Sequence, residues 1–303
     1  MTIAAPVALR FQVGARTLWS LKRRLVRVSP SLADIRAGAL PPLPPLPDDA
    51  HGYLVASVPE PAIEALVTNT DLRCLVRQRY TRRYADLAQG FDAYLASFSS
   101  KSRSTLLRKS RRFAERSGGA LDVRAYRTPA EVGEFHRLAR QVSALSYQEK
   151  LLDAGLPDGN AARAELGRLA AADRVRAFLL FLDGRPVSYL HLPANDDVLV
   201  YAHLGFDPAV SDLSPGGVLQ LEALRLLMQE GRFVALDFTE GEGQHKRQFA
   251  TGGVACADLL LLKPGILNRI AGDGLIAFDR AVARAKVALD SPQLRRWSRI
   301  VRR

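Results

Sequence analysis

The chain has 303 residues, a length that allows about two domains, and 48% of its residues are apolar, enough for sizeable cores. A formal net charge of +12 and a pI near 10.1 predict an anionic partner: a nucleic acid, an acidic membrane surface or a polyphosphorylated cofactor. The sequence has neither a run of 18 apolar residues nor the basic-then-apolar start of a secretory signal, so we expect a cytoplasmic protein. Cys74 and Cys256 are not clustered with histidines, which predicts buried thiols rather than a disulfide or a zinc site.

The first part of the chain combines basic and apolar residues. Residues 7–28 predict either an amphipathic segment on anionic lipid headgroups or a helix packed on the domain with a solvated basic face. The proline-rich residues 39–47 predict an extended strap. Strands are expected at residues 52–58 and 72–79, with a helix at 61–67 between them.

The next part is dominated by one strongly basic helix. A short helix is expected at residues 91–98, and residues 101–116 then carry seven basic side chains against one glutamate. Their apolar residues form only a narrow stripe, which predicts a helix that docks by one face. The charge ratio is lopsided for a face that is merely solvated.

Strand and helix signals alternate through the middle of the chain. A strand at residues 121–126 precedes a helix that starts at Thr128, where proline follows the capping residue, and runs to about Ser146. After a helix at 161–172, the Asp183-Gly184 pair joins two apolar runs and predicts a type I′ hairpin.

A strand, a glycine-rich turn, a helix and a second strand follow between residues 198 and 238. The strands are expected at 198–206 and 233–238. Ser214 is predicted to cap the helix, with Pro215 at its first position, and Gly231 to end it. The start of such a helix suits a phosphate, although the same residues also fit an ordinary cap and turn.

The motifs of this region resemble those of the GNAT-fold acyltransferases of the CelD type, which are associated with cellulose and exopolysaccharide synthesis and related to the FemABX peptidyltransferases. The resemblance covers roughly residues 84–263, about 60% of the chain. His245 stands where that family usually has tyrosine, and Thr239-Glu240 replaces a glycine. The motifs that match residue for residue are Phe206-Asp207-Pro208, Ser214-Pro215-Gly216, Asp237-Phe238 and Lys246.

The resemblance implies an α/β fold of the GNAT type, with a mixed central sheet flanked by helices. It divides the chain into a basic segment with the strap (1–50), a degenerate GNAT-like lobe with the arginine-rich helix (51–118), a catalytic lobe (119–265) and a basic helical tail (266–303). The tail contains Trp297 among arginines, so we expect it either on a lipid surface or in solvent.

Acyl transfer from a thioester to an amine needs a cradle for the donor's phosphates, a group that polarises the carbonyl and a base. The predicted donor site contains Leu204, Ser214, Gly216, Gly217, Arg108 and Arg112. His203 and Glu240 are candidate bases, and the resemblance offers Lys246 as a cation for a phosphate or an oxyanion. Tyr201 and Asp237 are expected on opposite sides of the thioester.

These features favour a cytoplasmic, membrane-associated N-acyltransferase that uses acyl-CoA or an acyl carrier protein thioester and no metal. Its acceptor would be an amine of a cell-envelope precursor, either an amino sugar or a long-chain amino lipid such as a sphingoid base. One alternative is a FemABX-like peptidyltransferase that uses aminoacyl-tRNA, in which case the basic helix would bind RNA phosphates. Another is a non-catalytic envelope-assembly subunit. Acyl chain length, the acceptor and the oligomeric state are left open.

Overall fold

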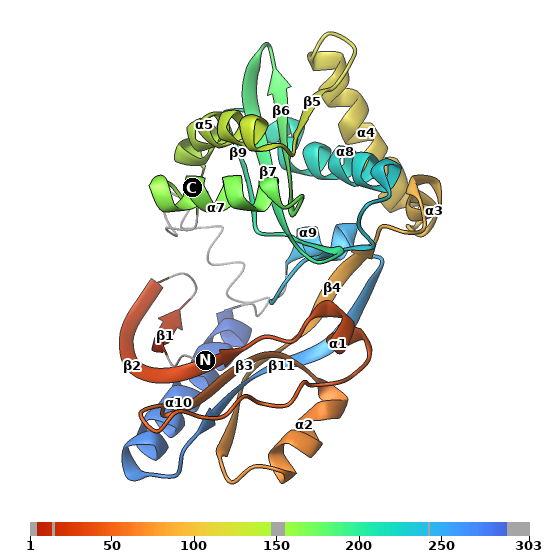
Figure 1. Ribbon diagram of the computed structural model, residues 1–303. Helices are drawn as coiled ribbons and strands as arrows, with labels where there is room; N and C mark the ends of the chain where they lie inside the picture. The colour runs from red at the N-terminus through yellow and green to blue at the C-terminus, as the bar shows by residue number, and fades with distance from the viewer. Residues whose placement is uncertain (1–4, 14–15, 147–154, 242, 290–303) are drawn as a thin grey trace, which may run out of the picture. The chain divides into compact units, whose positions relative to one another are not determined.

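The computed structural model describes residues 5–13, 16–146, 155–241 and 243–289 (Figure 1). Its contacts divide the chain into two compact units, Met1–Tyr80 with Val254–Arg303 and Thr81–Gly253. The division falls within two long strands, β4 (Arg73–Asp86) and β11 (Gly252–Leu262). Each unit is therefore built from segments of the same two strands, although each has its own hydrophobic clusters.

The first unit is a sheet with helices on both faces. Along β11, Leu259 and Leu261 pack with α2 and the proline-rich strap, while Leu260 and Leu262 pack with α10, because successive side chains of a strand point to opposite faces. Its strands lie in the order β1-β2-β3-β11-β4, with β1 (Ala5–Val13), β2 (Arg16–Val28) and β3 (Gly52–Pro59); its helices are α1 (Leu32–Arg36), α2 (Glu60–Thr68) and α10 (Ile266–Leu289).

The structure corrects the helix predicted within residues 7–28, because the described residues of this range, 7–13 and 16–28, belong to a pair of antiparallel strands. Contact of this segment with lipid stays a prediction. β2 also pairs in parallel with β3, from Leu25 opposite Gly52 onward. This pairing supplies the missing backbone hydrogen bonds from a distant part of the chain, which local periodicity cannot reveal. The strap at 39–47 is neither helix nor strand, as predicted, and its Pro44 carbonyl accepts a 2.6 Å hydrogen bond from the hydroxyl of Tyr53.

The second unit is a mixed sheet in the order β4-β10-β8-β7-β6-β5, in which β8 and β10 run parallel and β9 pairs only with β7. Its strands, besides the end of β4, are β5 (Asp122–Tyr126), β6 (Val175–Leu182), β7 (Arg185–Asn195), β8 (Val198–Val200), β9 (His203–Phe206) and β10 (Ala235–Asp237). Its helices are α3 (Phe91–Ala96), α4 (Ser100–Arg116), α5 (Pro129–Leu145), α7 (Asn160–Ala171), α8 (Pro215–Glu230) and α9 (Gln244–Phe249), with a 3-10 turn at Pro208–Leu213.

Helices cover both faces of this second sheet (Figure 1). On β6, Ala177 and Leu179 pack under α5 and α7, whereas Phe178 and Leu180 pack under α3, α4 and α8. Every residue of β6 is buried, which explains the continuous apolar run from Ala177 to Leu182. The predicted α/β class with a mixed sheet between helices is confirmed.

Most predicted helices are found within a residue or two of their expected ends. α5 begins at the expected capping box, in which Thr128 and Glu131 bond each other's backbone, and Asp183 and Gly184 take φ values of 51° and 74° at the hairpin turn. The predicted strand at 198–206 is instead broken at Tyr201-Ala202 into β8 and β9, and the strand expected at 233–238 is only three residues long. Among the described residues, no helix combines the length and apolarity needed to span a bilayer.

Candidate active site

The sheet of the second unit opens at the break between β8 and β9. Up to Val200, β8 pairs with β10, and the backbone N–H of Tyr201 donates the last bond, 2.8 Å to the carbonyl oxygen of Asp237. From His203 onward the chain pairs with β7 alone, opposite His191. A neighbouring parallel strand that turns away in this manner leaves a gap where a ligand can reach backbone and side chains.

A cavity of about 470 Å³ lies at this opening. That volume is within the range of small-molecule sites, about 300–1,000 Å³. Tyr201, in the break, and His203, the first residue of β9, both line it, as do the start of α8 and one side of α9. The lining residues are Lys109, Tyr201, Ala202, His203, Leu204, Phe206, Ser211, Ser214, Pro215, Gly216, Gly217, Gln220, His245, Gln248 and Phe249.

The first turn of α8 is open toward the cavity. Ser214 precedes the helix in a left-handed conformation with φ of 55°, and among the described residues no side chain caps the helix start. A side chain at Gly216 would press on β9, since its Cβ would lie 3.0 Å from Leu204. A Cβ at Gly217 would meet no described atom within 4 Å. The turn therefore offers uncapped backbone and the positive end of the helix dipole to an anion.

Two histidines and a tyrosine bring titratable groups to the cavity. Burial lowers the pKa of His203, and burial together with the adjacent Lys246 lowers the pKa of His245. Burial also raises the pKa of Tyr201, whose ring stacks on His245 at 5.5 Å between centroids. At neutral pH both imidazoles are therefore uncharged and can accept a proton, while the tyrosine hydroxyl keeps its own.

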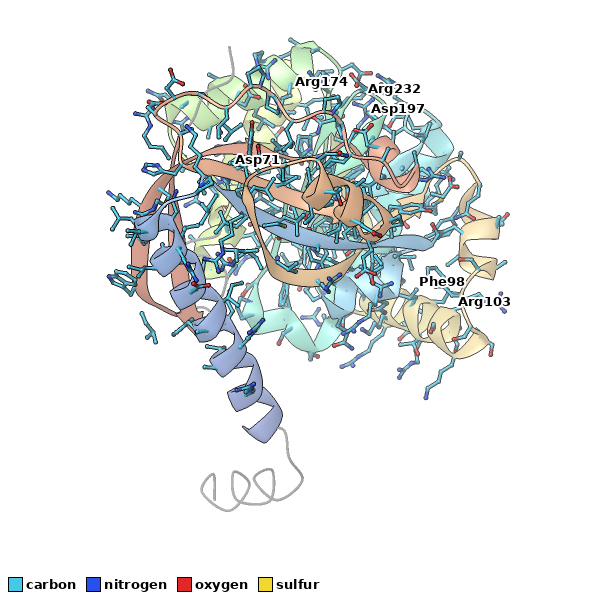
Figure 2. All side chains as sticks on the ribbon, turned by 90° about the horizontal axis from the view of Figure 1, so that it is seen from below. Asp71, Phe98, Arg103, Arg174, Asp197 and Arg232 are labelled. Atoms are coloured by element: carbon cyan, nitrogen blue, oxygen red, sulfur yellow. The ribbon has the colours of Figure 1, made fainter. Side chains whose placement is uncertain are left out.

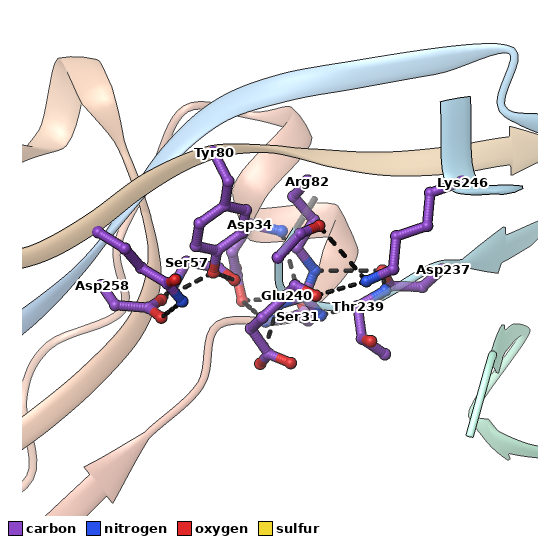
Figure 3. A network of polar contacts seen from close by, with 12 residues as sticks. Ser31, Asp34, Ser57, Tyr80, Arg82, Asp237, Thr239, Glu240, Lys246 and Asp258 are labelled. Atoms are coloured by element: carbon purple, nitrogen blue, oxygen red, sulfur yellow. Dashed lines mark hydrogen bonds and ion pairs between the residues drawn. The ribbon is translucent and has the colours of Figure 1, made fainter. Parts of the chain in front are cut away.

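The remaining catalytic candidates gather in a separate polar cluster next to the cavity lining (Figure 3). Asp237 is 3% exposed and receives two hydrogen bonds from the Arg82 guanidinium, at 2.6 and 3.1 Å. Glu240 lies 3.5 Å from the same arginine. The ammonium of Lys246 donates to the backbone carbonyls of Glu240 and Gly241. None of the three predicted residues lines the cavity as described, and their contacts order the loop after β10.

The arginine-rich helix α4 reaches the cavity through Lys109 rather than through the two predicted arginines. Arg108 is exposed, and Arg112 bonds Asp212 at 3.1 Å on the surface. Arg103 lies on the exposed side of the same helix (Figure 2). The helix thus presents one lysine to the cavity and most of its positive charge to solvent.

Sequence reasoning missed Lys109, Gln220, His245 and Gln248 as lining residues. Gln220 is 1% exposed, and its side-chain N–H₂ has no hydrogen-bond partner among the described residues. A buried amide in that state is uncommon and is satisfied when a ligand carbonyl accepts from it. Its position on the same face of α8 as Gly216, four residues later, was the available signal.

Comparison with known families supports this geometry. Residues 100–247 match the model of the Acetyltransferase (GNAT) domain. The second unit therefore has the GNAT fold. None of the curated protein sequences compared with the chain matches it. In the part of the chain that the structure describes, no three His, Cys, Asp or Glu side chains lie close enough together to hold a metal ion.

Two solved structures resemble most of the chain. The C-terminal domain (DUF2156) of a putative lysylphosphatidylglycerol synthetase from Agrobacterium fabrum has a TM-score of 0.51 and 13% identity, covering 79% of this chain and 73% of that one. The crystal structure of FemX has a TM-score of 0.51 and 11% identity, covering 85% and 87%. At such identities the likeness shows the fold alone.

The buried ion pair in the polar cluster makes a prediction about stability. Asp237→Ala removes the buried carboxylate that receives two hydrogen bonds from Arg82, while the contact with Glu240, at 3.5 Å, is longer. We therefore expect a loss of about 3–5 kcal/mol in the free energy of unfolding. The matched control is Asp122→Ala, which breaks a pair with Arg124 whose side chains are 43% and 50% exposed. That control should cost less than about 1 kcal/mol. Urea denaturation measures both, and equal losses would contradict the structural role assigned to Asp237.

Proposed function

We propose that the chain transfers an acyl group from the thioester of CoA, or of an acyl carrier protein, to an amine of a cell-envelope precursor. One observation carries the proposal: the uncapped start of α8 and the neutral imidazole of His203 face the same cavity. The first suits the phosphates of a donor, and the second suits removal of a proton from an amine. The match to a GNAT acetyltransferase model supports the reaction class.

The donor is held in this proposal by backbone and side chains of α8 and α4. A helix start stabilises an anion by about 0.3–1 kcal/mol in the open and up to ~2 when partly buried. Lys109 therefore has to add a charge-assisted contact to a phosphate, and Arg108 and Arg112 remain proposed contacts of its outer part. The unpaired amide of Gln220 can donate to a carbonyl of the donor.

The proposed chemistry needs one base and one acid at the cavity. His203 takes a proton from the acceptor amine while the amine nitrogen attacks the thioester carbonyl carbon. The carbon–sulfur bond of the thioester then breaks. Tyr201, whose hydroxyl stays protonated because it is buried, can return a proton to the departing thiolate. Lys246 and Glu240 act in this scheme through the loop they hold, which carries His245 toward Tyr201.

A second candidate function is transfer of an aminoacyl group from tRNA. It is favoured by the exposed basic side of α4 and by the likeness of the fold to FemX. The solved structure of a putative lysylphosphatidylglycerol synthetase domain also supports a lipid acceptor, whereas the CelD-type motifs support an amino sugar. An assembly subunit without activity is the third possibility, and it predicts no turnover with any donor.

A membrane location is proposed from the surface of the first unit. At the start of α10, Ile266, Leu267 and Ile270 are 78%, 74% and 65% exposed, and on β2 Leu18 and Trp19 are each 58% exposed. The Arg23 guanidinium bonds the carbonyl of Leu267, which joins the two elements. Exposed apolar side chains with basic neighbours suit the headgroup region of an anionic bilayer. We therefore propose a peripheral protein on the inner face of the cell membrane.

The donor site is tested by Gly217→Glu. A side chain there has open space, so the fold is kept while a negative charge enters the phosphate site. We expect the affinity for acetyl-CoA to fall by at least about tenfold, a loss of about 1.4 kcal/mol, in calorimetry. Gly217→Ala is the matched control and should bind as the wild type does. Unchanged affinity of Gly217→Glu for acetyl-CoA would show that the donor does not bind at the start of α8. If this variant lost only the binding of aminoacyl-tRNA, the result would favour the transfer of an aminoacyl group.

The base is tested by His203→Ala. Turnover should fall by about 10²–10⁴-fold with acetyl-CoA affinity retained. Because protonated imidazole cannot accept a proton, wild-type kcat/KM should fall as the pH drops, with an apparent pKa below the ordinary histidine value of 6.5. Glu240→Gln and Lys246→Ala are parallel variants outside the cavity. If Glu240→Gln abolished turnover while His203→Ala stayed active, the base would be Glu240 instead.

Membrane binding is tested with the triple variant Ile266→Ser, Leu267→Ser, Ile270→Ser. We expect the wild type to sediment with anionic phosphatidylglycerol vesicles, less so as salt rises, and the variant to sediment several-fold less. Val67→Ser, at an apolar position of α2 that is 44% exposed, is the control. Equal sedimentation with neutral and anionic vesicles, or of wild type and triple variant, would contradict the proposed surface.

A further inference from the structure

A second, smaller cavity of about 240 Å³ lies in the GNAT-fold unit, on the sheet face that α5 and α7 cover. Its walls are mainly aliphatic, from α7 and from the segment just before it. The polar exceptions are three histidines and one glutamate. The lining residues are His136, Leu156, Pro157, Ala162, Glu165, Leu166, Leu169, His191 and His203.

His191, on β7, is an unsatisfied polar group in this wall. Both of its ring nitrogens are shielded from solvent and have no hydrogen-bond partner among the described residues. Burial, with smaller contributions from His203 and His136, lowers its pKa to about 3, so the ring is neutral at physiological pH. A neutral imidazole has one donor and one acceptor, and buried polar groups in folded proteins nearly always have partners. The state of His191 therefore points to a ligand that supplies one.

Two of the other polar groups of the cavity, His136 and Glu165, are already engaged. His136 is bonded through Nε2 to the carbonyl oxygen of Pro157, at 2.9 Å. The carboxylate of Glu165 pairs with Arg168 at 2.7 Å, and both side chains are more than half exposed. No unpaired charge among the described residues thus lines the cavity, which disfavours a charged ligand there.

His203 connects the two cavities. Its side chain lines both of them, and its ring stacks on that of His191 with 5.8 Å between centroids and 12° between planes. If His203 deprotonates the acceptor amine, as proposed above, the acceptor must touch this ring while the donor occupies the larger cavity. The smaller cavity is then the space next to the base that is available to the rest of the acceptor.

We propose that the smaller cavity binds a neutral alkyl part of the acceptor, and that His191 hydrogen-bonds a hydroxyl or amide on it. At about 30 Å³ for each water-sized group, 240 Å³ holds roughly eight non-hydrogen atoms. The aliphatic wall suits an alkyl chain of medium length, whereas most hydroxyls of a sugar would find no hydrogen-bond partner among the residues described there. The acceptor class is therefore an alkyl amine with a neutral hydrogen-bonding group, such as an amino alcohol. This inference rests on the proposed acyltransfer.

The first experiment varies chain length with acetyl-CoA as donor. For 2-amino-1-alkanols of four to ten carbons, KM should fall by about fourfold per added methylene until the cavity is full, near eight carbons. In Ala162→Trp, which fills the cavity, the fall should stop several carbons earlier. Ala161→Trp, at the exposed neighbouring position of α7, is the matched control and should follow the wild type. A KM independent of acceptor length, or one that follows only the acyl chain of the donor, would overturn the inference.

The second experiment measures binding without turnover. In calorimetry, 1-octanol should bind the wild type at least about tenfold more tightly than Ala162→Trp, and the ring nitrogens of His191 should shift in nitrogen-15 NMR. His191→Phe keeps an aromatic ring but removes the hydrogen bond, so it should weaken 1-octanol binding while leaving acetyl-CoA binding intact. If the protein bound 1-octanol but had no transferase activity, the proposed function would be contradicted and the alkyl-binding cavity would stand. If the protein acylated amines but did not bind 1-octanol, the alkyl-binding role of the smaller cavity would be contradicted instead.

Discussion

The backbone N–H of Tyr201 donates the last hydrogen bond between β8 and β10, to the carbonyl oxygen of Asp237. The candidate site exists because the pairing of these two strands ends at this bond. Beyond it the chain turns to β7, and the sheet opens. The gap exposes Tyr201 and His203 on the strand side and receives the start of α8 from the other. A continuous strand from 198 to 206, as the residue pattern predicts, would have closed this space with a ladder of backbone bonds.

The short strand β10 is held at this critical point by side chains rather than by length. Three residues of strand provide few backbone bonds, and the Asp237 carboxylate adds contacts to the Arg82 guanidinium and to the backbone N–H of Thr239, at 2.8 Å. Thr239, two residues after Asp237, has a left-handed backbone conformation with a φ of 61°. Bonds made by a buried, charged carboxylate are among the stronger ones in a protein. The ion pair thus fixes where the strand ends and where the next loop begins.

The two cavities share His203 but differ in the chemistry of their walls. The larger one combines an uncapped helix start, a lysine and an unpaired amide, which are features for a polar, anionic molecule. The smaller one is mainly aliphatic, and its wall includes the neutral imidazole of His191, which has no hydrogen-bond partner among the described residues. An enzyme that joins an acyl group to an amine has to hold two such unlike molecules against one base. Burial lowers the pKa of His203, so its imidazole is uncharged near physiological pH.

Local signals in the sequence determined many of the parts. The capping box at Thr128, the Asp183-Gly184 hairpin and the proline and glycine at the two ends of α8 each act over a few residues, so they can be recognised without knowing the fold. Tyr201, His203 and Gly216, which the same reasoning named as site residues, line one cavity, although Tyr201 lies in a break rather than within the predicted strand. The assignment of catalytic roles stays a prediction.

Only the tertiary structure decided how those parts meet. Residues 16–28 form a strand that pairs with β1 along most of its length and with β3 from Leu25 onward. The strand at 198–206 breaks where its pairing with β10 ends, while β7 pairs with both of its parts. The sequence predicted His191 and His203 on strands. The fold decided that His191 is buried with no partner among the described residues and that His203 lines two cavities. Long-range pairing and burial depend on residues far apart in the chain, so no local pattern contains them.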